Sequence, residues 1–401
     1  MKKAGLITSI LLIATFAAFG QFPKIPKIGP KATPTPTNPT NNQGSNTSNQ
    51  VSTPNNNPSN STDGVATKPQ ATDTPVFLKT SLDVRCDLEN RYWKLPNESN
   101  YTSWIPQVKF KVFYKGNTKL RFLAEYFTPD GKPWFSETLE QSSADFSAQT
   151  VEISSSRGGS DRFTNKSTIV TGTYGVKITD TRDNSVLFQG KFKVNKYKYG
   201  PNIPMFKNQY SFYVEQDWNL PIGYVWLDWS GNGSNSPLPK VSVWIKDDIR
   251  AGDLEGRLFY NGQQVATTDD MGEVSDKDYR YPNVIEDKAL AYWKRWDFAW
   301  YKVRYASSAL SRKTFPQAKF INDMDGDYTV KIFYKAQQIR EVNFKVSGGN
   351  LADNGIAKQN NFADYKIIVP VKILATTEKW NATAWKTDAF YGNPLNSFNL
   401  Q

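Results

Sequence analysis

The sequence predicts an all-β protein with two tandem antiparallel β-sandwiches after a segment rich in Pro, Thr, Asn and Ser. The frame Gly-x-Tyr-x-Val-Lys-Ile occurs at 172–178 and again at 326–332. Each copy is followed by Phe-Lys-Val, at 192–194 and 344–346. From residue 76 onward, short aromatic and β-branched runs are separated by Gly, Asn, Asp and Pro, which is typical of strands and hairpins. A strand pair that occurs twice indicates two copies of one β domain.

The first element, residues 1–20, has the pattern of a signal peptide. Lys2 and Lys3 precede a short apolar run, and Ala18 and Gly20 supply the small residues of a cleavage site. The apolar run is too short for a comfortable membrane span. We therefore expect a bacterial protein that is secreted, on the cell surface or periplasmic, with no transmembrane span after signal cleavage.

Residues 21–75 are predicted to be a disordered linker, because almost no large apolar residue follows Ile28 in this segment. The whole chain has a formal net charge of +11. Lys2 and Lys3 leave with the signal, and the linker holds four Lys and two Asp, so the rest of the chain carries +7. This excess favours anionic polymers such as acidic envelope polysaccharides, although a basic surface without a specific anion explains it as well.

Further landmarks occur in both copies in the same order. A proline followed by strict alternation spans 106–112 and 239–245. A strand from Leu to Tyr then spans 120–126 and 254–260, and each leads into a hairpin signal, Asp-Gly or Asn-Gly. Because the order is conserved between the copies, chance similarity is a poor explanation.

These landmarks set the domain boundaries. The first sandwich is placed at 76–198 and the second, with an aromatic-rich insertion, at 205–350, with a stiff hinge at 199–204 between them. Residues 351–401 hold an extra strand and a C-terminal tail. Pro370 interrupts that strand, at 365–374, and should confine it to a sheet edge. It is expected either to extend its own domain or to mediate self-association by pairing with a neighbouring subunit.

The repeated frame resembles the closing strands of immunoglobulin-like and fibronectin type III-like sandwiches. In those folds a corner tyrosine bonds to backbone a few residues upstream, two positions before a buried residue. The resemblance implies that Tyr174 and Tyr328 are the corner residues and that Val176 and Val330 are buried. Neither copy has the cysteine pair of antibody domains, so the resemblance concerns architecture and implies no particular function.

Two residue counts exclude chemistry. Histidine is absent, which removes Ser-His and Cys-His nucleophilic catalysis and most catalytic zinc sites. The lone Cys86 cannot form an intramolecular disulfide, so it is expected to be a buried thiol or, alternatively, an intermolecular bridge. No catalytic residue, cofactor or specific nucleic-acid site is predicted, and we expect a protein that is not an enzyme.

One candidate binding site is the aromatic and basic run at 292–305. As a strand it places Trp296 and Trp300 on one face and Trp293 and Arg295 on the other. Flat rings next to cations can stack on sugars while the cations contact acid groups. The alternative is that one aromatic row fills the sandwich core.

A second candidate site is formed by Trp226 and Trp229, which precede a loop rich in Gly, Asn and Ser. Two Trp side chains beside such a loop suit neutral sugars, because loops at the ends of sandwiches commonly bind ligands. A strand that runs into an ordinary flexible loop explains the same pattern.

Alternating carboxylates at Asp323, Asp325 and Asp327 form a weak calcium candidate. The equivalent turn of the first copy has no acidic residues, so the turn belongs to the fold and the ion is optional. No metal site is therefore predicted.

Together these features predict a secreted or cell-surface, non-catalytic binding or structural protein. Its partner would be an anionic or neutral envelope polysaccharide or a surface protein. One alternative is a carbohydrate-active enzyme or its accessory module, and another is a subunit of an extracellular assembly.

Overall fold

The structure is a computed structural model, and it describes residues 71–90, 102–145, 149–155, 166–198, 210–230, 236–247, 249–280, 293–360, 365–376, 379–387 and 395–400. All of them belong to one compact unit, residues 59–401. The predicted signal peptide at 1–20, most of the linker predicted at 21–75 and the hinge predicted at 199–204 lie outside the described residues.

Two large antiparallel sheets make up most of the described chain, which confirms the predicted all-β class. The helices are short: α1 (Ala309–Thr314), α2 (Ile356–Gln359), α3 (Ala384–Thr387) and the 3₁₀ turns η3 (Asp217–Asn219), η5 (Ala251–Asp253) and η6 (Ile321–Asp323). Among the described residues, no helix has the length and apolar character that crossing a membrane requires.

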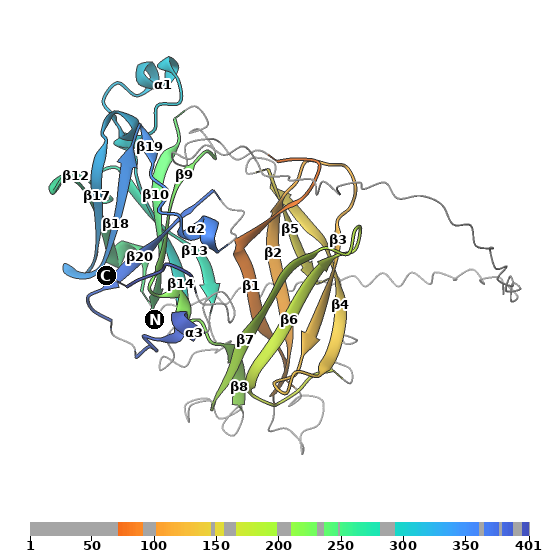
Figure 1. Ribbon diagram of the computed structural model, residues 1–401. Coiled ribbons are helices and arrows are strands. Elements are labelled where there is room, and N and C mark those ends of the chain that lie inside the picture. Colours follow the sequence, from red (N-terminus) through yellow and green to blue (C-terminus); the bar gives the residue numbers. More distant parts are fainter. Residues whose placement is uncertain are drawn as a thin grey trace, which may run out of the picture. The chain divides into compact units, whose positions relative to one another are not determined.

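The first sheet has eight strands in the order β1-β2-β5-β4-β3-β6-β7-β8 (Figure 1). Its end strands β1 and β8 contact each other, so the sheet curls around its own core. Strand β8 lies within the region predicted for the second sandwich but pairs with β7 of the first sheet. The bounds are β1 (Val76–Asn90), β2 (Thr102–Phe113), β3 (Arg121–Phe127), β4 (Pro133–Asp145), β5 (Thr150–Ser155), β6 (Gly172–Asp180), β7 (Val186–Lys198) and β8 (Tyr210–Val214).

Alternation along each strand builds the first core. On β2, Val108, Phe110 and Val112 are fully buried, while Lys109 and Lys111 between them face outward. Side chains of a strand alternate between its two faces, so this sequence buries one face and solvates the other. Burying each large apolar side chain contributes roughly 1.5–3 kcal/mol.

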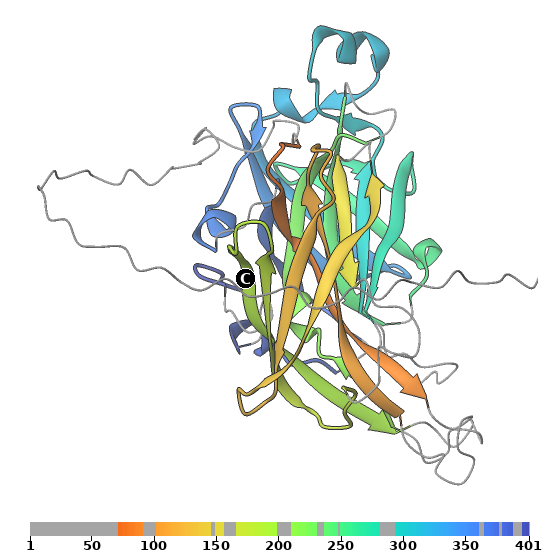
Figure 2. The same ribbon diagram turned by 90° about the vertical axis from the view of Figure 1, so that its right-hand side faces the viewer.

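The second sheet has ten strands, with β12-β11-β17-β18-β20-β9-β10-β14-β13 as its main order and β19 paired to β18. Strands β15 (Val303–Arg304) and β16 (Lys319–Phe320) form a small parallel pair, and α1 lies at one end of this part of the molecule (Figures 1 and 2). The bounds are β9 (Ile222–Asp228), β10 (Leu238–Lys246), β11 (Leu254–Tyr260), β12 (Gln263–Thr267), β13 (Gly272–Arg280), β14 (Trp293–Trp300), β17 (Gly326–Tyr334), β18 (Gln337–Ser347), β19 (Asn350–Leu351) and β20 (Ile367–Ile373).

Strand β20 joins the two halves of the second sheet. Its first half pairs with β9, through Pro370 opposite Ile222, and its second half pairs with β18, from Val371 opposite Val342. Pro370 stands where the strand changes partner, so its missing N–H leaves no gap in either ladder. The strand therefore lies between two strands of its own domain and not at an end of the sheet. The expected edge position is therefore wrong, whereas self-association through residues 365–374 stays a prediction.

The halves joined by β20 enclose the second core. Val241 and Val243 of β10 pack in one apolar cluster with Leu258, Val330 and other residues of β11, β17 and β18. Both halves of the second sheet contribute residues to this cluster. The apolar face of each half is therefore buried against the other half.

The repeated frame forms the same hairpin in both copies. Tyr174 pairs with Phe192 across β6 and β7, and Tyr328 pairs with Phe344 across β17 and β18. In each pair the rings stack, with centroids 5.8 Å and 5.1 Å apart. Each tyrosine hydroxyl donates to a carbonyl four residues upstream, at 2.9 Å and 2.8 Å. The valines two positions further along are buried, so both tyrosines have the geometry of a corner residue.

The glycine that opens each frame is required by its backbone. Gly172 has φ of +146° and Gly326 has φ of +150°, a region that other residues rarely adopt. A Cβ atom at Gly326 would stand 2.7 Å from the side-chain oxygen of Asn261, and one at Gly172 would stand 2.9 Å from Pro129. The glycines therefore allow the strand to start against the preceding hairpin turn.

Candidate binding cleft

Two of the predicted binding residues are core residues. Trp296 and Trp300 are each 1% exposed and pack in the second apolar cluster. The indole N–H of Trp300 donates to the Gly256 carbonyl at 2.9 Å, which satisfies its polar atom inside the core. These two residues are thus unable to stack on an external ligand, and the alternative assignment to the sandwich core is the correct one.

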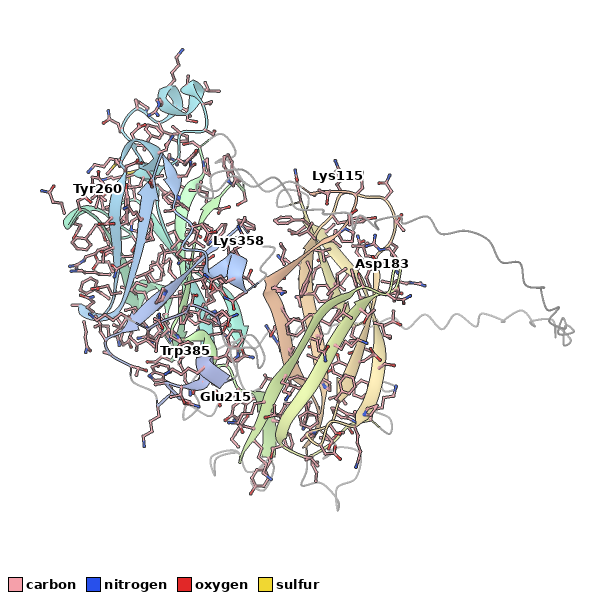
Figure 3. The ribbon with its side chains drawn as sticks, in the orientation of Figure 1. Lys115, Asp183, Glu215, Tyr260, Lys358 and Trp385 are labelled. Carbon is pink, nitrogen blue, oxygen red and sulfur yellow. The ribbon has the colours of Figure 1, made fainter. Side chains whose placement is uncertain are left out.

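Trp293 is also buried, on the opposite face of β14. Its indole N–H donates to Asp217 at 2.9 Å, and the same carboxylate oxygen accepts a hydrogen bond from Lys246 at 2.9 Å. The other oxygen of Asp217 accepts the backbone N–H of Asn381 at 2.8 Å. Trp293 therefore belongs to a structural network and not to a binding surface. Figure 3 labels Trp385 at α3, and this side chain belongs to the first apolar core.

Two of the three acidic residues of the weak calcium candidate have separate partners. Asp323 forms an ion pair with Arg312, and the carboxylate of Asp325 accepts the N–H groups of Gly348 and Gly349 at 2.7 Å and 2.9 Å. Within the described part of the chain, no cluster of three acidic or cysteine side chains could hold a metal ion. The turn is explained by the fold.

Cys86 lies on β1, opposite Pro106 of β2, and packs against the first core. The residue is partly buried. Burial, followed by the nearby charge of Asp87, raises the pKa of its thiol well above 9.0. The thiol is consequently a poor nucleophile at neutral pH.

A cleft of about 1000 Å³ contains the remaining predicted residues Trp226 and Arg295. One wall is the outer face of β9, β10, β14 and β13, opposite the second core. The other wall comes from β1, β2 and β5 of the first sheet. Tyr365 connects the two, because its ring contacts both Phe113 and Trp226. The fourth predicted tryptophan, Trp229, packs against Tyr305 outside the lining of the cleft.

Strand alternation builds the wall on the second sheet. Cross-strand rows bring Trp226 beside Lys240, and Ser242 beside Asp297. The indole N–H of Trp226 donates to the Ser242 hydroxyl at 3.1 Å, which fixes the ring in the wall. Lys240 lies over that ring, with its ammonium 5.7 Å from the ring centroid. The ring is half-buried, so part of its surface remains available to a ligand.

The Lys240 ammonium is paired with Asp228 at 2.8 Å, and both side chains are nearly buried. Burial alone would raise the pKa of Asp228, but the hydrogen bonds from Lys240 and Ser230 together with the charge of Lys240 outweigh it and lower this pKa. Burial likewise opposes the charged form of Lys240, and the hydrogen bond to Asp228 raises its pKa. Both groups are therefore charged at neutral pH and largely cancel each other.

The same wall holds a second charged pair, Arg295 and Asp297, whose contact is longer than that between Lys240 and Asp228. The Arg295 Nε lies 3.5 Å from an oxygen of Asp297, whose side chain is 3% exposed. Neither of these two atoms makes a hydrogen bond with the described residues. Buried polar atoms are normally satisfied. Both side chains line the cleft, where the rest of the Arg295 guanidinium can donate to a polar ligand and the rest of the Asp297 carboxylate can accept from one.

Two further groups line the cleft. The hydroxyl of Tyr301 donates to Glu273 at 3.2 Å, and the guanidinium of Arg304 stacks on Phe315 with 3.6 Å between its carbon and the ring centroid. The cleft therefore combines partly exposed aromatic rings with charged groups, which suits a polar ligand with flat faces.

Sequence reasoning found Trp226 and Arg295 but missed Lys240, Asp297 and Arg304. The available signal was the alternation itself, since Lys240 and Ser242 of β10 flank the buried Val241, and Arg295 and Asp297 of β14 flank the buried Trp296. That pattern marks an outward face. It does not show that another wall covers this face.

Comparisons with protein-family models, with curated proteins and with solved structures found no match to this chain.

Proposed function

We propose that this is a secreted or cell-surface, non-catalytic protein that binds an envelope polysaccharide in the cleft. The observation that carries the proposal is the pairing of a fixed, partly exposed Trp226 ring with the charged and polar side chains that line the same cleft. Aromatic faces pack against the apolar faces of sugar rings, and the polar groups match their hydroxyls. The signal-like N-terminus supports an extracytoplasmic setting.

The volume of the cleft agrees with such a ligand. Small-molecule sites commonly measure roughly 300–1,000 Å³, and this cleft, at about 1000 Å³, stands at the top of that range. An oligosaccharide segment fits this size better than a single sugar does.

The test is binding of the mature chain to an array of envelope glycans, followed by titration of the ligands found. Trp226→Ala should weaken binding at least about tenfold, which corresponds to about 1.4 kcal/mol. Trp229→Ala is the matched control, because this half-buried tryptophan lies three positions away and outside the cleft. Equal binding by the wild type and Trp226→Ala would contradict the proposal.

A carbohydrate-active enzyme is the second candidate, and the carboxylate of Asp297 favours it. This group is nearly buried and has an oxygen without a hydrogen-bond partner among the described residues, as an acid–base residue could. Release of reducing ends from a bound polysaccharide, abolished by Asp297→Asn, would establish turnover. Binding without such release supports the non-catalytic proposal.

A further inference from the structure

Arg304 is a cation of the cleft whose charge is not balanced by a carboxylate. Its Nη1 donates to the Ser236 carbonyl at 3.2 Å, and its guanidinium stacks on Phe315. Its Nε makes no hydrogen bond with the described residues, and no ion pair to a described carboxylate is present. A carbonyl and a ring satisfy part of the guanidinium but leave its charge uncompensated.

The other cations of the cleft mostly have acidic partners. Lys240 pairs with Asp228 at 2.8 Å, and Lys109 pairs with Glu152 at 3.0 Å. Among the described residues that line the cleft, seven are basic and five are acidic. The imbalance is positive, and Arg304 is one of the partly buried cations of the cleft.

Partial burial makes this charge costly. Loss of hydration lowers the pKa of Arg304 below its ordinary value. A guanidinium removed from water is stabilised best by an anion, and its planar fork can form two parallel hydrogen bonds with one. Stacking on Phe315 holds the plane of the fork in place, so little freedom is lost when an anion binds.

We propose that the polysaccharide in the cleft is acidic and that Arg304 binds its acid group. This inference rests on the proposed function and names the class of ligand. The acid group anchors one sugar at Arg304, while Trp226 and the polar groups around Asp297 contact neighbouring sugars and their hydroxyls. The shared chemistry is an anionic group on a saccharide, which a uronic acid carboxylate or a phosphodiester supplies.

The experiment is calorimetric titration of the mature chain with a galacturonic acid oligosaccharide and with its neutral methyl ester. We expect the acid to bind more tightly than the ester. Arg304→Gln should weaken binding of the acid about 10- to 100-fold, the range for hydrogen bonds to a charged group, and should leave binding of the ester unchanged. A glycerol phosphate polymer, titrated in parallel, distinguishes a phosphate source from a carboxylate source.

Two variants control for charge and folding. Arg312→Gln removes the same charge from an exposed site on α1 and should change the affinity less than twofold. Arg304→Lys keeps the charge but loses the planar fork, so an intermediate affinity is expected, and thermal unfolding of each variant verifies the fold.

Three outcomes would overturn the inference. In the first, Arg304→Gln binds the acid as tightly as the wild type does. In the second, Arg312→Gln loses as much affinity for the acid as Arg304→Gln does. In the third, an oligonucleotide of equal charge competes with the acid for binding as well as the acid itself does. Tight binding of acid and ester alike, still sensitive to Trp226→Ala, would refute the acidic ligand but keep the proposed function. Binding of no saccharide would refute both.

Discussion

The carboxylate of Asp217 connects segments that are distant in the sequence, so replacing it should destabilise the whole unit. It accepts hydrogen bonds from Lys246 of β10, Trp293 of β14 and the backbone of Asn381 in the C-terminal tail. Its side chain is 5% exposed, and that of Lys246 is 16% exposed. The perturbation considered is Asp217→Ala, which removes the acceptor and leaves the donors in place.

The magnitude follows from the buried pair. Removing one partner of a buried ion pair destabilises a protein by roughly 3–5 kcal/mol. We expect about 3 kcal/mol for the ion pair, because Lys246 keeps a hydrogen bond to the Lys379 carbonyl. The unsatisfied indole N–H of Trp293 adds about 1 kcal/mol. The total of about 4 kcal/mol is a large part of the 5–15 kcal/mol that stabilises typical domains.

The assay is urea unfolding of the mature chain, followed by tryptophan fluorescence. The matched control is Asp270→Ala, which breaks the Asp270–Lys302 ion pair at the surface, where the two side chains are 63% and 42% exposed. This control should change stability by about 0.5 kcal/mol or less. A loss below about 1 kcal/mol in Asp217→Ala, or one no larger than in the control, would refute the reasoning.

Two predictions concern other residues. Trp300→Ala should destabilise the second domain by roughly 3–5 kcal/mol, because it empties a core position. The folded fraction of this variant should bind ligand like the wild type. Impaired binding by the fully folded variant would contradict the assignment of Trp300 to the core. Burial, and next the charge of Asp217, raises the pKa of Glu215 above 4.5. The native state thus binds this proton more tightly than the unfolded state does, so the group lowers stability as pH rises from 4.5 through the raised pKa. Glu215→Gln should remove this pH-dependent loss of stability. In parallel urea titrations, the wild type should therefore lose more stability than the variant between pH 4.5 and neutral pH. Identical pH profiles of the two proteins would count against a raised pKa of Glu215.

Much of the fold could be predicted from local patterns. The hairpins that contain Tyr174 and Tyr328 were visible as a repeated frame because each is formed by neighbouring strands with short connections. Strand β8 and the partner change at Pro370 were not visible. Neither has a counterpart in the repeat, and pairing partners that are far apart in sequence leave no local signature.

The candidate site shows the same division. A strand pattern places Trp296 and Trp300 on one face of β14 but does not say whether that face is inside or outside. The structure decides this by packing them against β11, β17 and β18. The outer face, with Arg295 and Asp297, becomes part of a cleft because a wall of the first sheet also lines it.

The sequence by itself determined the all-β class, the duplicated hairpin and the absence of histidine chemistry, because these depend on residue type and on spacing along one strand. Only the tertiary structure decided which tryptophans are core, which charges are paired and where Arg304 lies without a carboxylate. Those properties depend on the neighbours that a side chain contacts across strands. Such neighbours can come from parts of the chain more than a hundred residues away, as with Asp217 and Asn381.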